Sequence, residues 1–393
     1  MDTNIIHTGD CFDVLQTLPD ESVHMVMTSP PYWNLRDYDH ADQLGLEPES
    51  EQYVQNMADV FDEVKRVLRP DGSRWLNLGD TYENKDLQQI PARVALELQQ
   101  RGWILRNRVT WAKPNPMPQS VKDRLNDTTE AVFHFVKTKS YWYDLDAIRE
   151  PHCERVREML DNTSKNELEN VKAKYMHVQP NNLDKRNRDE SFDNNKKCHP
   201  SGKNPGDVFE VTTKPFPEAH FAVYPPELCE KPIKATCPPK VCAGCGSPYE
   251  REVERTTPDS KDVRNGDGRE FGDNDETTGM RRGSPAALMS GQEFNRWKAN
   301  NPDEFKGWTP TCDCDTDATE PGVALDPFAG AGTTLLKAKE LGRRFVGVEL
   351  NAEYADMARA RIGLTPNDPA NVRSDDAQRG FEAYTDGGAS DAE

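Results

Sequence analysis

The sequence contains no long apolar run and no excess of basic residues. No stretch approaches the roughly 18 apolar residues of a membrane-spanning helix, and the opening MDTNIIHTGD lacks the basic and apolar regions of a signal peptide. Acidic residues outnumber basic ones 68 to 49, and the net charge of −19 argues against a surface that binds polyanions everywhere. These absences predict a cytoplasmic protein with no membrane partner, in which nucleic acid would need a local basic cleft.

Two further features limit the ligand class and the redox chemistry. The phosphate-loop pattern GxxxxGK followed by Ser or Thr is absent, which argues against a nucleoside triphosphate as the ligand. Nine cysteines are present, an odd number, and they are clustered. In a reducing compartment such clusters indicate a metal site before they indicate disulfides. With 393 residues, the chain is long enough for two or three domain-sized units.

The pattern of apolar residues changes several times along the chain. Residues 1 to about 150 alternate between apolar strands and helices, which is typical of a mostly parallel sheet with helices on both faces. Helical spacing from Glu51 to Leu68 predicts one helix, and Pro70-Asp71-Gly72 is expected to end it in a turn. Residues 151–206 are polar and poor in apolar side chains, and the alternation returns after about residue 316.

The sequence VALDPFAGAGTT at 323–334 predicts a ligand-binding turn. A strand ends at Asp326, Gly330 and Gly332 let the backbone approach a ligand closely, and Thr333 begins a helix. The next strand, FVGVEL, ends in Glu349, whose carboxylate can accept both hydroxyls of a ribose. A nucleotide-like cofactor is the favoured interpretation, and a glycine-rich turn without a ligand is the alternative.

A second motif, Ser29-Pro30-Pro31-Tyr32, follows the apolar strand VHMVMT. The two prolines stiffen the backbone and leave a carbonyl that faces no donor within the chain. A serine hydroxyl beside such a carbonyl makes a paired acceptor site, and Tyr32 adds an aromatic face. These groups suit a planar exocyclic amine such as that of cytosine or adenine, although an ordinary Pro-Pro turn would show the same pattern.

Together, DPFAGAGTT and SPPY resemble the S-adenosylmethionine-dependent amino-methyltransferases of DNA, in the beta arrangement where the catalytic motif precedes the cofactor motif. The resemblance covers about 1–150 and 207–362. It implies catalysis by Ser29, Pro30, Pro31 and Tyr32. It also implies that TGDCFDVL brings Asp10 near the adenine of the cofactor. The implied cofactor-binding residues are Asp10, Asp326, Phe328, Gly330, Gly332, Thr333 and Glu349.

The resemblance implies a doubly wound, mostly parallel, seven-stranded α/β sheet of the Rossmann-like methyltransferase type, circularly permuted. The two halves of the sheet would lie at opposite ends of the chain, with insertions between them. The expected segments are the catalytic half at 1–150, a variable target-recognition insert at 151–206, a return to the fold at 207–236, a cysteine-rich zinc-ribbon-like insert at 237–315, the cofactor-binding half at 316–363 and an acidic disordered tail at 364–393.

The implied reaction is methyl transfer to the exocyclic amine of a base flipped out of double-stranded DNA, with Tyr32 stacking on the base. In the family, Ser at the first motif position more often accompanies cytosine N4 than adenine N6, so cytosine is favoured. An RNA or protein-amide substrate and a non-catalytic zinc-ribbon nucleic-acid-binding protein are the alternatives. A cognate restriction endonuclease is a possible partner.

The cysteines after residue 236 indicate a structural zinc site. CAGCG supplies Cys242 and Cys245, and CDC supplies Cys312 and Cys314. Four thiolates would close the coordination shell, so that no position remains for catalytic water. Cys237 as a substitute ligand, and free thiols, stay open as alternatives. The pair Cys198-His199 is interpreted as chance, and no role as nucleophile is expected for Cys11 or Cys153.

Local groups of basic residues are candidates for phosphate contacts, with solvated surface as the alternative. One group is expected near the catalytic face, at Arg101, Arg106, Arg108, Lys113, Lys122 and Arg124. The other group, together with amide side chains, lies in the insert at Lys185, Arg186, Asn187, Arg188, Asn194, Asn195, Lys196 and Lys197.

Overall fold

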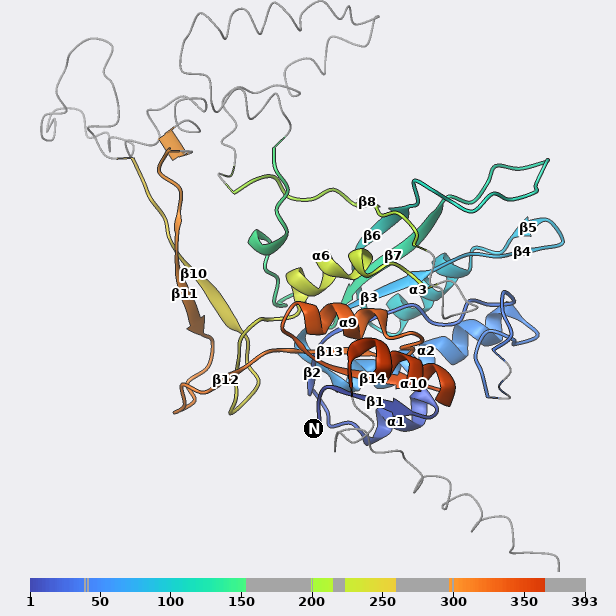
Figure 1. Cartoon of the computed structure of the whole chain (residues 1–393), viewed down its shortest axis with the longest axis horizontal. Coiled ribbons are helices and arrows are strands. Elements are labelled where there is room, and N and C mark those ends of the chain that lie inside the picture. The colour runs from blue at the N-terminus through green and yellow to red at the C-terminus, as the bar shows by residue number, and fades with distance from the viewer. Residues whose placement is uncertain are drawn as a thin grey trace, which may run out of the picture. The chain divides into compact units, whose positions relative to one another are not determined.

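The computed structural model describes residues 1–38, 40, 42–152, 199, 201–214, 223–258, 297–298 and 300–364. The helices and strands, shown in Figure 1, are β1 (Ile5–Thr8), α1 (Cys11–Thr17), β2 (Val23–Thr28), α2 (Ser50–Val67), β3 (Leu68–Leu78), β4 (Tyr82–Glu83), β5 (Asp86–Leu87), α3 (Ile90–Gln100), β6 (Ile104–Ala112), β7 (Thr129–Val136), β8 (Val208–Glu210), α6 (Pro226–Thr236), β9 (Val241–Cys242), β10 (Tyr249–Glu254), β11 (Glu304–Pro310), β12 (Thr319–Glu320), β13 (Val323–Asp326), α9 (Thr333–Glu340), β14 (Arg344–Glu349) and α10 (Ala352–Ile362).

The chain forms two compact units. The larger unit contains Met1–Ala147, Gly206–Tyr249 and the chain from Pro310 onward, and the smaller contains Ile148–Pro205 and Glu250–Thr309. The cysteine-rich segment expected at 237–315 is therefore divided between them, and all four candidate zinc ligands belong to the larger unit. In the described part of the smaller unit, most of β10 pairs with β11. Arg251 lies over the rings of Phe305 and Trp308.

The larger unit is built on one mixed sheet in the order β1-β14-β13-β2-β3-β7-β6-β8. Pairing is parallel from β1 to β3 and between β6 and β8, and antiparallel between β3 and β7 and between β7 and β6. The expected number of seven strands was wrong. The eighth is β8, three residues that pair with the edge of β6, with Val208 opposite Thr110.

Segments from both ends of the chain form this sheet. In Figure 1 the blue strand β1 lies beside the red-orange strand β14, with Ile5 opposite Val346. Strand β2 lies between β13 and β3 and is buried along its whole length. Its near-continuous apolar sequence fits a central parallel strand covered on both faces.

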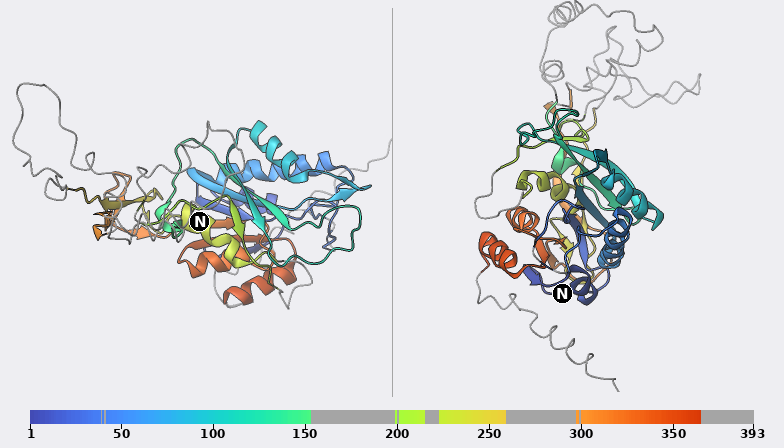
Figure 2. Two further views of the ribbon diagram at one scale, coloured as in Figure 1. Left: turned by 90° about the horizontal axis from the view of Figure 1, so that it is seen from above. Right: turned by 90° about the vertical axis from the view of Figure 1, so that its right-hand side faces the viewer.

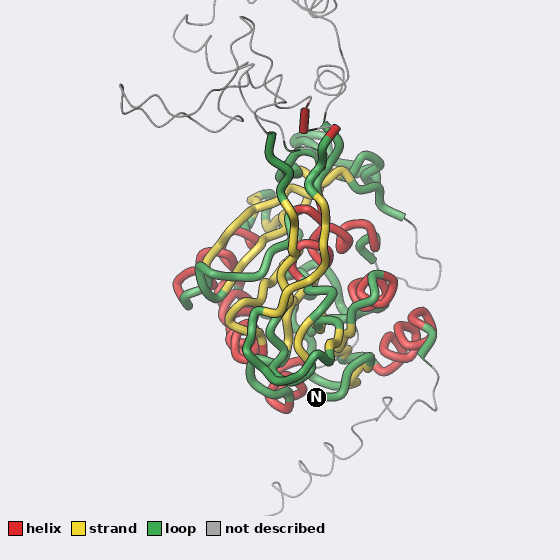
Figure 3. Tube along the Cα trace, turned by 90° about the vertical axis from the view of Figure 1, so that its left-hand side faces the viewer, coloured by secondary structure: helices red, strands yellow, loops and turns green. Residues whose placement is uncertain are grey.

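Helices cover both faces of the sheet, as Figures 2 and 3 show. Helices α1, α2 and α3 pack on one face around Leu15, Phe61 and Leu98, and α6, α9 and α10 pack on the other around Ile233, Leu335 and Ala358. None of the described helices is long and apolar enough to cross a membrane.

The predicted helix at Glu51–Leu68 is confirmed as α2, Ser50–Val67. The predicted turn at Pro70-Asp71-Gly72 lies within β3 instead of before it. The pairing of β2 with β3 jumps there, because Val23 is opposite Leu68 and Met25 is opposite Ser73. The four intervening residues bulge from the ladder, which accommodates a proline that cannot donate a hydrogen bond.

Several expectations concern residues outside the described part of the chain. They are the recognition residues Lys185, Arg186, Asn187, Arg188, Asn194, Asn195, Lys196 and Lys197, the thiols Cys153 and Cys198, and the tail from residue 365 onward.

A buried histidine makes the fold sensitive to acid. His134 in β7 stacks on Trp75 with ring centroids 4.3 Å apart and shares a hydrogen bond with Ser73. Burial lowers the pKa of His134 to about 3. The unfolded chain therefore binds this proton at a higher pH than the folded chain does. Stability should be complete above about pH 6.5 and fall towards pH 3, by up to about 1.4 kcal/mol per pH unit.

The variant His134→Gln keeps a hydrogen-bonding group near Ser73 but has no titrating ring. Urea unfolding at pH 7 and pH 5 should show a smaller acid-induced loss of unfolding free energy in this variant than in the wild type. His40→Gln, which changes a side chain that is 38% exposed, is the control and should keep the wild-type pH dependence. An unchanged pH dependence in His134→Gln would contradict the expectation.

Candidate active site and metal centre

A cavity of about 840 Å³ opens where the parallel strands end. The carboxyl ends of β1, β2, β13 and β14 meet at one edge of the sheet, as ligand sites in doubly wound folds require. Both sequence motifs reach this cavity: Ser29 to Tyr32 on one side, and Phe328, Gly330 and Glu349 on the other.

The hydroxyl of Ser29 belongs to a hydrogen-bonded chain that ends at a carboxylate. Ser29 Oγ lies 3.1 Å from the hydroxyl of Tyr32, which donates to Glu130 Oε2 at 2.7 Å. Asn77 donates to both Tyr32 Oη and Glu130 Oε2 at 2.8 Å, and Lys113 donates to Glu130 Oε1. Because Tyr32 gives its proton to Glu130, the hydrogen of Ser29 points at Tyr32. Ser29 Oγ accepts a hydrogen bond from Asn77 at 3.3 Å, so one lone pair of Ser29 remains for another donor.

The aromatic ring of Tyr32 is held in place as well. A Cβ atom at Gly79 would lie 2.4 Å from Cε2 of Tyr32, so the ring packs directly on the Gly79 backbone. Burial, and then the nearby charge of Glu130, raise the pKa of Tyr32 well above its ordinary value. The phenol is therefore a fixed neutral donor.

The two proline carbonyls differ. Tyr53 Oη donates to the carbonyl of Pro31 at 2.8 Å. Among the described residues, no donor is bound to the carbonyl of Pro30. Ser29 Oγ and Pro30 O are thus the acceptors that the motif presents.

The carboxylate of Asp326 is fully buried and is not part of the cavity wall. It accepts hydrogen bonds from Thr28 Oγ1 at 2.7 Å, from the Phe328 amide at 3.1 Å and from Tyr224 Oη at 3.1 Å. Burial raises its pKa. Asp326 therefore fixes the path of the loop that follows it and does not face a ligand.

The two glycines after Asp326 have different surroundings. Gly330 has φ +50°, and a Cβ atom there would meet nothing within 4 Å, because it would enter the cavity. Gly332 has φ +72°, and a Cβ atom there would lie 2.9 Å from Ile362 and 3.0 Å from Ala358. Gly330 thus leaves room for a ligand, whereas Gly332 allows α9 to pack closely on α10.

Glu349 and Asp10 are two of the acidic residues that border the cavity. Glu349 accepts hydrogen bonds from the amides of Gly330 at 2.7 Å and Asn351 at 3.0 Å, and burial raises its pKa. Each of its oxygens has a second lone pair for a ligand hydroxyl. Asp10 caps α1 by accepting from the amides of Phe12 and Asp13. Thr333 also lines the cavity and receives a hydrogen bond from Arg361.

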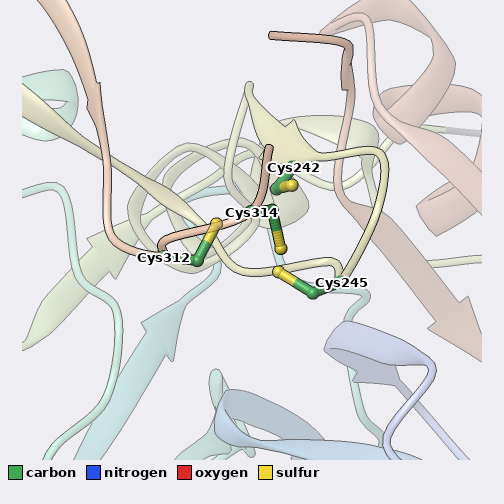
Figure 4. Close-up of side chains that lie close together, drawn as sticks. All are labelled: Cys242, Cys245, Cys312 and Cys314. Carbon is green, nitrogen blue, oxygen red and sulfur yellow. The ribbon is translucent and has the colours of Figure 1, made fainter. Parts of the chain in front are cut away.

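Cys242, Cys245, Cys312 and Cys314 converge, with their sulfur atoms all within 4.8 Å of one another (Figure 4). A hydrogen bond with Ser247 lowers the pKa of Cys245 to about 6, whereas hydrogen bonding among the neighbouring thiols raises that of Cys314 to about 12. Four thiolates this close repel one another unless a cation lies between them. Cys237 is buried elsewhere, with its sulfur near Gly322.

The cysteine cluster is tied to the sheet. His24 in β2 shares a hydrogen bond with the Gly246 carbonyl at 2.9 Å and accepts one from the Val323 amide at 3.1 Å. Arg69 donates to the carbonyl of Cys245 at 3.2 Å. The short strands β9 and β12 pair antiparallel, with Cys242 opposite Thr319. The cluster thus joins the chain around β9 to the chain that leads through β12 into β13.

Sequence reasoning missed three side chains of the site, namely Asn77, Glu130 and Tyr224. Glu130 is the one acidic residue in the otherwise mainly apolar strand β7, and that contrast was a usable signal.

The basic residues that the sequence placed near the catalytic face do not all lie in the site. Arg101 forms ion pairs with Asp59, Asp62 and Glu97, and Lys113 binds Glu130 inside the site.

Comparison with known proteins agrees with this arrangement. The N6/N4 DNA methylase family model matches residues 23–242 and 318–360. The Type II methyltransferase M.SfiI of Streptomyces fimbriatus is 49% identical over 164 residues, which are 37% of this chain and 39% of that protein. The Type II methyltransferase M.XycI of Xanthomonas campestris pv. cyanopsidis is 30% identical over 384 residues, 90% of this chain and 86% of its own.

Among solved structures, the PvuII DNA methyltransferase (cytosine-N4-specific) superposes with a TM-score of 0.50 at 17% identity and covers 93% of this chain and 88% of its own. At that identity the match supports the methyltransferase fold. The family model covers β2, β13 and β14, the strands that lead into the two motifs and Glu349. The chain therefore belongs to the N6/N4 DNA methylase family.

Proposed function

We propose that this protein transfers a methyl group from S-adenosylmethionine to the N4 amine of a cytosine flipped out of double-stranded DNA. The observation that carries the proposal is the shared cavity, onto which the acceptor pair at Ser29 and Pro30 and the glycine loop at Gly330 both open. A two-substrate transfer needs its electrophile and its nucleophile in one water-poor space.

S-adenosylmethionine fits the groups on one side of the cavity. Glu349 offers carboxylate lone pairs to ribose hydroxyls, and Gly330 leaves space for close approach to the backbone. Asp10 and Phe328 complete the wall, and Asp326 and Gly332 act indirectly through the shape of the loop. When bound, this cofactor supplies an electrophilic methyl group on a sulfonium.

The other side suits an amine. The lone pair of a base amine is delocalised into the ring, so the amine is a poor nucleophile. Hydrogen bonds from its two N–H groups to Ser29 Oγ and Pro30 O would draw the nitrogen towards tetrahedral geometry. The chain from Ser29 through Tyr32 keeps one serine lone pair available, and it offers the surplus proton a path to the Glu130 carboxylate.

Cytosine is preferred to adenine because Ser29 occupies the first motif position. Adenine N6 is the alternative substrate atom.

RNA or a protein amide is less favoured as the substrate, since methyltransferases that act on them tend to have Asn at the first motif position. A non-catalytic zinc-ribbon protein is disfavoured by the complete site. A cognate restriction endonuclease would be the partner if the protein protects host DNA. The insert at 151–206 and the cysteine-rich segment at 237–315 are together the expected target-recognition region. We further interpret the assembly of one sheet from both chain ends as a circular permutation.

Zinc is the proposed occupant of the cysteine cluster, which would then be a small zinc-ribbon-like module. A tetrahedron with Zn–S bonds of about 2.3 Å separates its sulfurs by about 3.8 Å, which the observed spacing within 4.8 Å can reach with small side-chain shifts. The dication would also remove the repulsion between thiolates. Its role is structural, because it would hold the chain at Cys245 and Gly246 in place beside β2, where His24 and Arg69 contact it.

Gly330→Leu should abolish binding of S-adenosylmethionine, measured by calorimetry, because the side chain would fill the space of the ligand. Gly342→Leu is the matched control. Gly342 also has positive φ, at +69°, with nothing near its Cβ position, so it carries the same backbone strain outside the cavity. Strain of about 1–2 kcal/mol is expected in both variants. Equal cofactor affinity in the two variants would exclude this loop from the cofactor site.

Nucleoside mass spectrometry of DNA incubated with the wild type should detect N4-methyldeoxycytidine. Ser29→Ala should lower kcat by about 10²-fold, and Tyr32→Phe by about tenfold, while both keep their affinity for S-adenosylmethionine. Tyr141→Phe is the control, since the Tyr141 hydroxyl binds Arg106 away from the cavity. Detection of N6-methyldeoxyadenosine alone would replace cytosine by adenine, and full turnover in Ser29→Ala would remove this motif from the reaction.

Protein purified without a metal-binding tag should contain one zinc ion per chain by elemental analysis. Cys312→Ser should lose the metal and unfold at a lower temperature, because metal binding adds to the free energy of folding. Cys237→Ala should keep the zinc, since Cys237 is outside the cluster. A folded, active and metal-free wild-type protein would contradict the assignment.

A further inference from the structure

The loop between β6 and β7, residues 113–128, has a defined shape beside the cavity. Pro114, Pro116 and Pro118 alternate along it and restrict its backbone. Asn115 donates to the carbonyl of Thr213 at 3.0 Å and accepts from its amide at 2.9 Å. The backbone before Met117 is thus held by contacts of Asn115 that do not involve the Met117 side chain.

Met117 is 83% exposed and borders the cavity. Leu125 in the same loop is 89% exposed but does not border it. A single exposed apolar side chain is ordinary by itself. What distinguishes Met117 is its position: a rigid loop holds an unburied methionine at the rim of the space proposed to receive a base.

The acidic residues of this loop are paired. Lys85 binds Asp123 at 2.6 Å, and Arg124 binds Asp127 at 2.8 Å while lying over the ring of Tyr82. Lys122 has no ion-pair partner among the residues that the structure describes. The loop therefore has a local excess of positive charge despite the net charge of −19, so it can approach phosphates.

A base that leaves the duplex opens a gap in the stack, and unstacking costs a few kcal/mol. Proteins that distort DNA often insert apolar side chains, methionine among them, between base steps. Methionine suits such a gap because its chain is flexible and its sulfur is polarisable. A side chain that is already exposed has no buried contacts to lose when it inserts.

We propose that Met117 is a wedge that enters the DNA stack as the target base moves into the cavity. This inference rests on the proposed function and deepens it, because it names a residue that acts on the duplex. Met117 would lower the barrier to extrusion without touching the methyl group or the reacting amine.

The test uses the full-length protein and a duplex that contains the site found by sequencing DNA methylated by the wild type. A second duplex has an abasic site opposite the target base, so that extrusion costs little. Met117→Ala should lower kcat/KM about tenfold or more on the paired duplex and less than about threefold on the other. Leu125→Ala should change neither value, and Met117→Leu should retain most activity on both.

Calorimetry should show that Met117→Ala binds S-adenosylmethionine as the wild type does. An equal loss on the two duplexes, or no loss on either, would overturn the wedge. If the wild type is folded and binds S-adenosylmethionine but methylates no DNA, the proposed function fails instead, and that result is distinct from a failure of the wedge alone.

Discussion

A buried hydrogen bond between Thr28 and Asp326 connects the two halves of the site. The residues are 298 positions apart in the chain, yet their strands are neighbours in the sheet, and the two atoms lie 2.7 Å apart. A buried carboxylate is tolerated only when its oxygens are satisfied, and Thr28, Tyr224 and the Phe328 amide meet that need. The loop with Gly330 is thereby held in register with Ser29, and the cavity between them follows from this constraint.

Features encoded by contiguous residues could be predicted. The helix at Ser50–Val67 follows from its spacing of apolar residues, and the cavity unites Ser29–Tyr32 with Gly330 and Glu349, as the two motifs implied. The four cysteines converge although 66 residues separate Cys245 from Cys312. Each of these patterns reflects a structural feature that neighbouring residues form by themselves, such as a tight turn, the end of a strand or a loop that carries two cysteines.

Features that depend on contacts between distant segments could not be predicted. The acidic Glu130 stands out in β7, but its partner Tyr32 could not be predicted, because the antiparallel pairing of β7 with β3 that brings them together is encoded by no local pattern. Asp326 was expected to bind the cofactor; its carboxylate is buried outside the cavity wall and accepts hydrogen bonds from Thr28, Tyr224 and the Phe328 amide. The strand β8 has three residues, too few for a periodic pattern of apolar side chains. It forms by backbone pairing with the edge of β6.

The order of strands has a consequence for how the chain acquires its structure during synthesis. Strand β1 pairs with β14, and β2 pairs with β13 along one of its edges, so the partner of β1 and one partner of β2 are made last. Contacts of such long sequence separation form slowly, and unpaired strand edges invite association with other chains. The nascent chain must therefore keep β1 and one edge of β2 from aggregating while about 300 further residues emerge. The half of the sheet that can close earlier, β3 with β7 and β6, would serve as the template on which the last strands complete the enzyme.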